Sequence, residues 1–172
     1  MPTAPLAYVI ENDRITATVT ELVLRKHLRR GEVRTYGNGR LALDGLGEAL
    51  RSGHAVPDLI LLDLDMPVMD GWEFLDALRS VPVAKHLCVF VLTSSIHPDD
   101  AGKAKRYPQV KGFFSKPLSS ESVAWMQHFV HLAGASGRAQ RLGATAPSRW
   151  HGAPAPAAAP DYGGTRLGTR PR

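Results

Sequence analysis

The sequence has little cysteine, no long apolar run and almost no acid in its last 39 residues. Its single cysteine, Cys88, excludes an internal disulfide and with it the class of small secreted proteins that disulfides stabilise. No apolar stretch approaches the roughly 20 residues of a membrane-spanning helix. The apolar run Leu6–Ile10 follows no basic residue and leads directly into Glu11, unlike a secretory signal. These absences predict a cytoplasmic protein in which Cys88 is a buried, small apolar residue.

The scarcity of acid near the end of the chain separates two regions. Residues 134–172 hold six arginines and one acid, whereas residues 1–133 hold 15 basic and 15 acidic residues. The formal charge of +5 therefore comes from the terminal segment, and a nucleic-acid-binding fold with a basic face is disfavoured. Ala, Gly and Pro make up 21 of the last 39 residues, a composition that buries too little apolar surface to fold. We predict one domain over residues 1–133 and a disordered tail over residues 134–172.

Five apolar segments alternate with segments of helical character. The predicted strands are Leu6–Ile10, Glu32–Tyr36, Leu59–Leu62, Leu87–Leu92 and Val110–Phe114. Several are apolar without alternation, which is typical of strands covered on both faces. Between them apolar residues recur at helical spacing, first in Ile15, Val19, Leu22 and Val23. Asp13 and Asp70 are expected to cap the first and third helices. This order predicts an α/β fold with a doubly wound parallel sheet.

Polar residues follow the predicted strands. Glu11 comes after the first strand, Asp63 after the third, Thr93 after the fourth and Lys116 after the fifth. In an open doubly wound sheet the functional site lies outside the carboxyl ends of the strands. A carboxylate can hold Mg²⁺ or accept a phosphoryl group, and a lysine and a hydroxyl can bind the phosphoryl oxygens. This edge is therefore the candidate site, with phosphoryl transfer as its chemistry.

Three motifs resemble those of bacterial two-component response-regulator receiver domains. Pro57–Phe74 resembles the phosphoacceptor segment, Val91–Ser95 the fourth-strand hydroxyl motif and Phe113–Leu118 the Lys-Pro motif. The resemblance covers about residues 5–133 and implies a flavodoxin-like, five-stranded parallel sheet in the order 2-1-3-4-5. It implies a stand-alone receiver, not an enzyme, that takes a phosphoryl group from a sensor histidine kinase. It also suggests a homodimer through the fourth helix, fifth strand and fifth helix, with no DNA-binding domain and no transmembrane segment.

The resemblance assigns roles to single residues. Asp63 is the expected phosphoacceptor. Lys116, joined to Pro117 by an expected cis peptide bond, pairs with the phosphoryl oxygens. Thr93 and Phe113 are the expected switch residues: Thr93 turns toward the phosphoryl group and Phe113 follows it inward.

Magnesium is the expected cofactor, held by Glu11, Asp63 and the backbone carbonyl of Asp65. The family usually places two adjacent acids after the first strand, whereas here Glu11 is followed by the neutral Asn12. We therefore expect weaker Mg²⁺ binding, with the amide oxygen of Asn12 as a further candidate ligand.

Two other functions fit parts of the sequence. Asn12 motivates a phosphorylation-independent adaptor that keeps the receiver fold. Asp63 and Asp65 after an apolar strand resemble the nucleophile motif of haloacid dehalogenase-like phosphatases, with Thr93 and Lys116 as later motifs. That family needs further acids after the lysine, and the acids present there, Glu121 and Asp161, are poorly placed. The receiver is the leading hypothesis.

Overall fold

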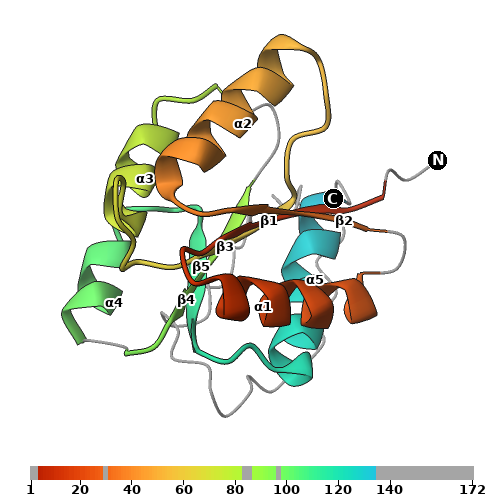
Figure 1. Cartoon of the computed structure of the whole chain (residues 1–172), viewed down its shortest axis with the longest axis vertical. Helices are drawn as coiled ribbons and strands as arrows, with labels where there is room; N and C mark the ends of the chain where they lie inside the picture. The colour runs from red at the N-terminus through yellow and green to blue at the C-terminus, as the bar shows by residue number, and fades with distance from the viewer. Residues whose placement is uncertain (1–3, 29–30, 83–86, 96–97, 135–172) are drawn as a thin grey trace, which may run out of the picture.

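The computed structural model describes residues 4–28, 31–82, 87–95 and 98–134, which form a five-stranded parallel sheet flanked by helices (Figure 1). The strand order is β2-β1-β3-β4-β5. The strands are β1 Leu6–Ile10, β2 Glu32–Tyr36, β3 Leu59–Leu62, β4 Cys88–Thr93 and β5 Val110–Ser115. The predicted fold class and strand order are confirmed.

The last two strands extend further than their apolar runs predicted. β4 begins one residue later than predicted and ends at Thr93, and β5 ends at Ser115. Thr93 pairs with Ser115 in the parallel ladder, and the Lys116 amide donates to the Thr93 carbonyl at 2.9 Å. Backbone hydrogen bonds thus continue into polar residues, so Thr93 belongs to the strand itself.

Each of the five helices follows one strand. They are α1 Arg14–His27, α2 Gly39–Arg51, α3 Gly71–Leu78, α4 Pro98–Ala104 and α5 Ser120–Gly134. Asp13 caps α1 by accepting a hydrogen bond from the Thr16 amide at 2.7 Å. Asp70 and Glu73 form a reciprocal capping box at the start of α3. Both predicted caps are confirmed, and both sit at the edge of the sheet where the strands end.

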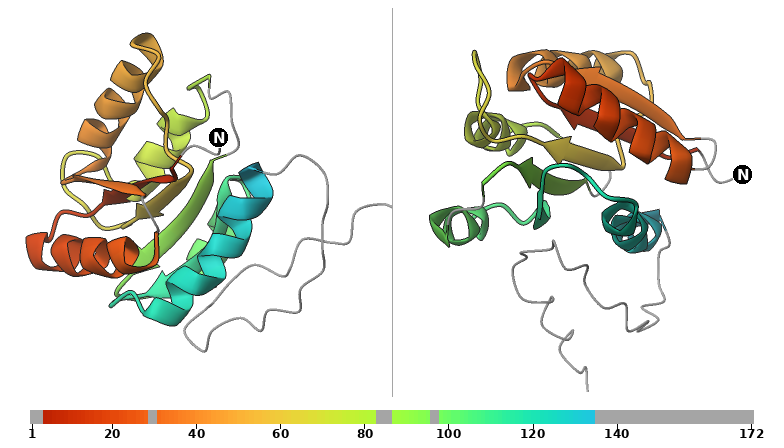
Figure 2. Two further views of the ribbon diagram at one scale, coloured as in Figure 1. Left: turned by 90° about the vertical axis from the view of Figure 1, so that its right-hand side faces the viewer. Right: turned by 60° about the horizontal axis from the view of Figure 1, so that its bottom comes forward.

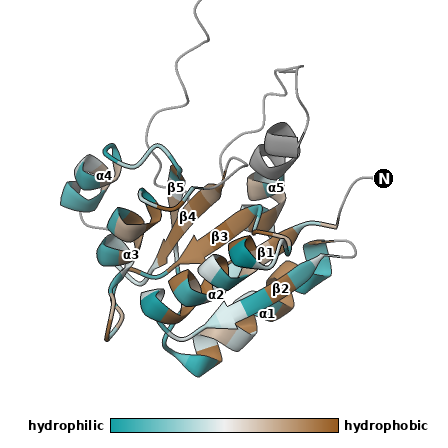
Figure 3. Cartoon of the chain, turned by 90° about the horizontal axis from the view of Figure 1, so that it is seen from above, coloured by the Kyte–Doolittle hydropathy of each residue, from teal (hydrophilic) through white to brown (hydrophobic). Residues whose placement is uncertain are grey.

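The helices cover both faces of the sheet (Figure 2). On one face, Leu46 of α2 and Leu75 of α3 pack in one cluster with Ile60 of β3. On the other face, Leu24 of α1 and Met126 of α5 pack in a cluster with other residues of β1, β3 and β4. The central strands are correspondingly apolar, whereas the edge strand β2 is more polar (Figure 3).

The regularly spaced apolar residues of helix α1 do not lie on the face that the helix buries. Ile15, Val19 and Leu22 are 76%, 40% and 62% exposed, whereas Thr20 and Leu24 are buried. At about 100° per residue, the exposed stripe lies almost opposite the buried face. The side of α1 that faces away from the sheet is therefore apolar.

Three further predictions concern burial and the chain ends. Cys88 is buried, as predicted, and burial raises the pKa of its thiol. Within the described ranges no helix is long and apolar enough to cross a membrane. The predicted disordered tail lies outside the described residues from residue 135 onward, and its disorder stays a prediction.

Candidate functional site

The strand ends bring Glu11, Asp63 and Lys116 into direct contact. The Glu11 amide donates to the Tyr36 carbonyl at 2.9 Å, and the Asp63 amide donates to the Ile10 carbonyl at 3.0 Å. These bonds extend the parallel ladder by one residue beyond β1 and β3. They fix both acids at neighbouring positions on the edge of the sheet, where Lys116 follows β5.

Lys116 forms ion pairs with both carboxylates. Its Nζ lies 2.5 Å from Glu11 Oε2 and 2.9 Å from Asp63 Oδ2. Glu11 and Asp63 are each 5% exposed, and the Lys116 side chain is 18% exposed. Among the described residues, the buried Glu11 Oε2 has this ion pair with Lys116 and no other hydrogen-bond donor. The cluster therefore has one negative charge in excess and one oxygen able to accept a further ligand.

The environment shifts the proton affinities of this cluster. Burial raises the pKa of Glu11 above its usual range, and the opposing effect of Lys116 does not cancel it. Burial disfavours the charged form of Lys116, but its close contacts with the Glu11 and Asp63 carboxylates raise the pKa of the amine above its usual value. Lys116 is therefore firmly cationic at neutral pH.

Thr93 and Phe113 lie beside the cluster in the interior. Thr93 is 1% exposed, and its hydroxyl donates to the Ser95 carbonyl at 2.9 Å. The hydroxyl is thus engaged with its own loop in this state. Phe113 is also 1% exposed and packs with Val91 of β4. The inward position expected for Phe113 is therefore already occupied in this structure.

The predicted ligand Asn12 lies at the surface, and so does the side chain of Asp65, whose backbone carbonyl is the predicted ligand. The side chains of Asn12 and Asp65 are exposed, and no described residue forms a hydrogen bond or ion pair with either side chain. The Asp65 amide points to Asp63 Oδ1 at a long 3.5 Å. Asp13 serves the site indirectly, since its amide donates to Glu11 Oε1 at 3.0 Å and orients that carboxylate. The side chains of Asn12 and Asp65 are thus close to the cluster in sequence but outside its contacts, whereas the Asp65 backbone amide reaches Asp63.

The loop after β3 holds that strand against α3. The Gly71 amide donates to the Leu64 carbonyl at 3.0 Å, and a Cβ on Gly71 would lie only 2.5 Å from the Asp63 carbonyl oxygen. Only glycine allows this close approach. In the same loop Val68 has a φ of 73° and is 81% exposed, a strained conformation for a β-branched residue. Helix α3 therefore packs directly on the backbone of Asp63.

The donor set at this edge suits magnesium. Mg²⁺ commonly uses one or two carboxylates and fills its remaining positions with other oxygen ligands, such as water. Glu11 and Asp63 supply two carboxylates, one of them with a buried oxygen lacking a hydrogen bond. Over the part of the chain that the structure describes, no three acidic, histidine or cysteine side chains gather as a metal site. The candidate cation site is thus one acid poorer than a three-carboxylate site, because Asn12 is neutral.

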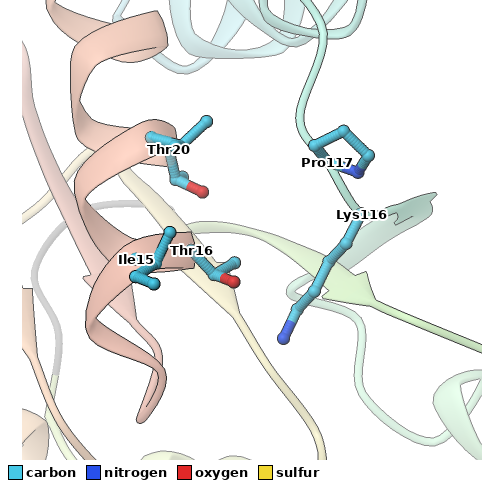
Figure 4. A pocket seen from close by; sticks show the side chains of 6 residues that line it. Ile15, Thr16, Thr20, Lys116 and Pro117 are labelled. Atoms are coloured by element: carbon cyan, nitrogen blue, oxygen red, sulfur yellow. The ribbon is translucent and has the colours of Figure 1, made fainter.

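The structure adds a pocket that the motifs did not predict. About 330 Å³ in volume, it is lined by Ile15, Thr16, Val19 and Thr20 of α1 and by Lys116 and Pro117 (Figure 4). The Lys116–Pro117 bond is cis, as predicted. The apolar spacing in residues 15–23 predicted an apolar stripe on this helix. Spacing alone could not show that the stripe is exposed and lies beside a pocket. The pocket joins the outer face of α1 to the lysine of the site.

Comparisons with known proteins agree with this geometry. The family model described as "Response regulator receiver domain" matches residues 7–126. The probable methanogenesis regulatory protein FilR2 of Methanothrix harundinacea is 33% identical over 93 residues, which cover 54% of this chain and 59% of FilR2. The transcriptional regulatory protein PrrA of Mycobacterium tuberculosis is 38% identical over 101 residues, which cover 58% of this chain and 40% of PrrA. The chain thus spans less than two thirds of these curated relatives.

Solved structures show the same likeness. A two-component response regulator from Cytophaga hutchinsonii superposes with a TM-score of 0.68 at 27% identity, covering 76% of this chain and 99% of that one. The chemotaxis protein CheY4 of Vibrio cholerae superposes with a TM-score of 0.62 at 25% identity, covering 74% of this chain and 99% of that one.

Proposed function

The chain belongs to the response regulator receiver domain family of two-component signalling, and from this premise we propose that it receives a phosphoryl group on Asp63 from a sensor histidine kinase. The observation that carries the proposal is the buried contact of Lys116 with both Glu11 and Asp63 at the carboxyl ends of three strands. The family match favours this function over a haloacid dehalogenase-like phosphatase. The protein then acts as a cytoplasmic signalling protein that gains and loses a phosphoryl group.

The proposed transfer uses the groups already in contact. A carboxylate oxygen of Asp63 attacks the phosphorus of a donor phosphohistidine, and the P–N bond breaks as the P–O bond forms. The electron pair stays on the imidazole nitrogen, which takes a proton from solvent. Lys116, 2.9 Å from Asp63 Oδ2, neutralises charge on the transferred oxygens. Thr93 would release the Ser95 carbonyl and donate its hydrogen bond to a phosphoryl oxygen.

Mg²⁺ is the proposed cofactor. Glu11, Asp63 and the backbone carbonyl of Asp65 would hold it, with the Asn12 amide oxygen as a further ligand. When bound, the cation supplies positive charge to the phosphoryl oxygens. Since Asn12 replaces an acid, we propose that phosphorylation needs more Mg²⁺ than it would with an acid at this position.

The exposed apolar stripe on α1 is the proposed contact for the phosphodonor. Ile15, Val19 and Leu22 form a stripe at helical spacing, and Lys116 and Pro117 line the pocket beside it. A partner helix packed on this stripe would bring its phosphohistidine to the edge of the sheet that holds Asp63. Leu22→Ser is therefore expected to slow phosphotransfer from a phosphorylated kinase several-fold while leaving phosphorylation by acetyl phosphate unchanged. Equal effects on both donors would contradict this docking face.

The output is proposed to be a protein contact. Over the described residues the chain forms a single α/β unit, with no second domain. We propose a stand-alone receiver whose changed shape is read by another protein or by a second copy through α4, β5 and α5.

Intact mass spectrometry after incubation with Mg²⁺ and acetyl phosphate tests the proposed function. The wild-type protein should gain the mass of one phosphoryl group, and Asp63→Asn should gain none. Asp65→Asn is the matched control, since this neighbouring acid is exposed and should still allow the adduct. Failure of the wild-type protein to gain mass at any Mg²⁺ concentration would instead support the phosphorylation-independent adaptor.

A further inference from the structure

Helix α4 is held to the domain by few contacts of its own. It has seven residues, and of its side chains whose burial the structure describes only Ala104 is buried. Ala104 contributes a single methyl group to a small cluster with Leu64, Val91 and Phe113. An element with so little buried apolar surface opens easily unless other interactions hold it.

Two polar–aromatic contacts tie α4 and the turn after it to α3. Lys103 Nζ lies 4.3 Å from the centre of the Trp72 ring, within the range of a cation–π interaction. The Tyr107 hydroxyl donates to Asp76 Oδ1 at 2.8 Å, and Tyr107 is 4% exposed. The Trp72 and Tyr107 rings are themselves 5.8 Å apart. These four residues, which we call the α3–α4 clasp, form one connected set.

The clasp is linked to the acceptor through one residue. Leu64 follows Asp63 directly, and its carbonyl accepts the hydrogen bond of Gly71 at the start of α3. Its side chain packs with Ala104 of α4 and Phe113 of β5, and Trp72 packs against the same cluster. A change of backbone position at Asp63 would therefore be transmitted through Leu64 to α3 and α4, the two helices that the clasp joins. Thr93 also connects the site to α4, which begins five residues after it. The Thr93 hydroxyl donates a hydrogen bond to the carbonyl of Ser95, in the segment that leads from β4 to α4.

We propose that the α3–α4 clasp holds α4 in the position that belongs to unphosphorylated Asp63, and that it opens when Asp63 is phosphorylated. The proposal rests on the proposed function. Withdrawal of the Thr93 hydroxyl from the Ser95 carbonyl removes a bond from the segment leading into α4. Because the clasp stabilises the first position of α4, part of the free energy gained on phosphorylation goes into opening it. The clasp residues therefore set the equilibrium between the two positions of α4.

Hydrogen exchange of α4 in the unphosphorylated protein tests the hold. The Arg106 amide donates to Lys103 at 3.1 Å and the Tyr107 amide to Ala104 at 2.9 Å, so a peptide covering residues 98–110 reports on opening. Lys103→Met and Tyr107→Phe should each speed this exchange about threefold to tenfold, the effect of losing one such contact. Lys105→Met is the matched control, because Lys105 is exposed near Lys103 and, among the described residues, lies over no aromatic ring. Equal exchange in Lys103→Met and Lys105→Met would overturn the clasp.

Exchange measured after acetyl phosphate treatment tests the opening. Wild-type protein shown by intact mass to carry the phosphoryl group should exchange in residues 98–110 nearly as fast as Lys103→Met/Tyr107→Phe, and this double variant should change little on phosphorylation. Identical exchange in wild-type protein with and without a confirmed adduct would overturn the coupling while leaving the proposed function intact. Absence of any adduct would refute the proposed function and the phosphorylation-driven opening together, and the unphosphorylated comparison would still decide whether the clasp holds α4.

Discussion

Replacing Lys116 by Met is expected to destabilise the protein by about 3 kcal/mol at neutral pH. Met keeps most of the length of the side chain and removes the ammonium group. In the structure Nζ lies 2.5 Å from Glu11 Oε2 and 2.9 Å from Asp63 Oδ2. Removing one partner of a buried ion pair costs about 3–5 kcal/mol. The lower end applies because the Lys116 side chain is 18% exposed.

The loss should also depend on pH. Since both oxygens contact the same nitrogen, they lie within about 5.4 Å of each other, where two unit charges repel by about 3 kcal/mol at an effective dielectric constant near 20. Protonation of Glu11, whose pKa burial already raises, relieves this repulsion. A carboxyl group with a higher pKa in the folded than in the unfolded protein stabilises the fold as pH falls through the folded value. The difference in stability between wild type and Lys116→Met should therefore shrink from about pH 8 to about pH 5.5.

Urea unfolding followed by circular dichroism at both pH values measures this difference. Lys111→Met is the matched control, because Lys111 donates to the Pro108 carbonyl at 2.7 Å and forms no ion pair with a buried acid of the described residues. Its loss should stay below about 1 kcal/mol at either pH. A loss in Lys116→Met that is equal at the two pH values, or no larger than the control, would refute the view that Lys116 compensates two buried carboxylates.

Three other substitutions test the site and its loop. Asn12→Asp should tighten Mg²⁺ binding about tenfold, because one more negative charge near a divalent cation contributes more than about 1 kcal/mol; calorimetric titration with Mg²⁺ showing equal affinity would contradict this. Gly71→Ala should lower stability by about 1–3 kcal/mol and slow phosphorylation by acetyl phosphate, since its Cβ would lie 2.5 Å from the Asp63 carbonyl oxygen; unchanged urea midpoints and rates would show that the loop yields freely. Val68→Gly should raise stability by about 0.5–1 kcal/mol by relieving the strained φ of 73°, and a fall in urea midpoint would argue against strain.

The cluster of charged residues could be predicted from the sequence because each member directly follows a strand. Parallel strands end at one edge, so Glu11, Asp63 and Lys116 were expected at the same edge of the sheet. The same logic could not place the side chain of Asn12, which is exposed one residue past the ladder. The Asp65 side chain is exposed as well, but the ligand predicted there is its backbone carbonyl, and this stays a prediction. Strand β4 ends at Thr93, one residue later than predicted, because backbone hydrogen bonding continues past the last apolar residue.

Other features depend on contacts between distant segments. Helical spacing identifies the sides of α1 but not which side packs on the sheet. Here Thr20 and Leu24 are buried, whereas the more apolar stripe is exposed. The α3–α4 clasp joins residues that share no motif: Lys103 and Trp72 meet only because both helices cover the same face of the sheet. Such pairings follow from the packed structure and leave no local pattern in the chain.

The two-sided character of α1 also bears on how this protein can change over evolutionary time. Its inward residues, Thr20 and Leu24, are committed to the core, whereas Ile15, Val19 and Leu22 contribute little to it because they are exposed. Mutations at these three outward positions can therefore accumulate without unfolding the domain. After a gene duplication, substitutions on this exposed face of α1 could therefore change the binding partner. The buried acids, the lysine and the sheet that aligns them would stay unchanged.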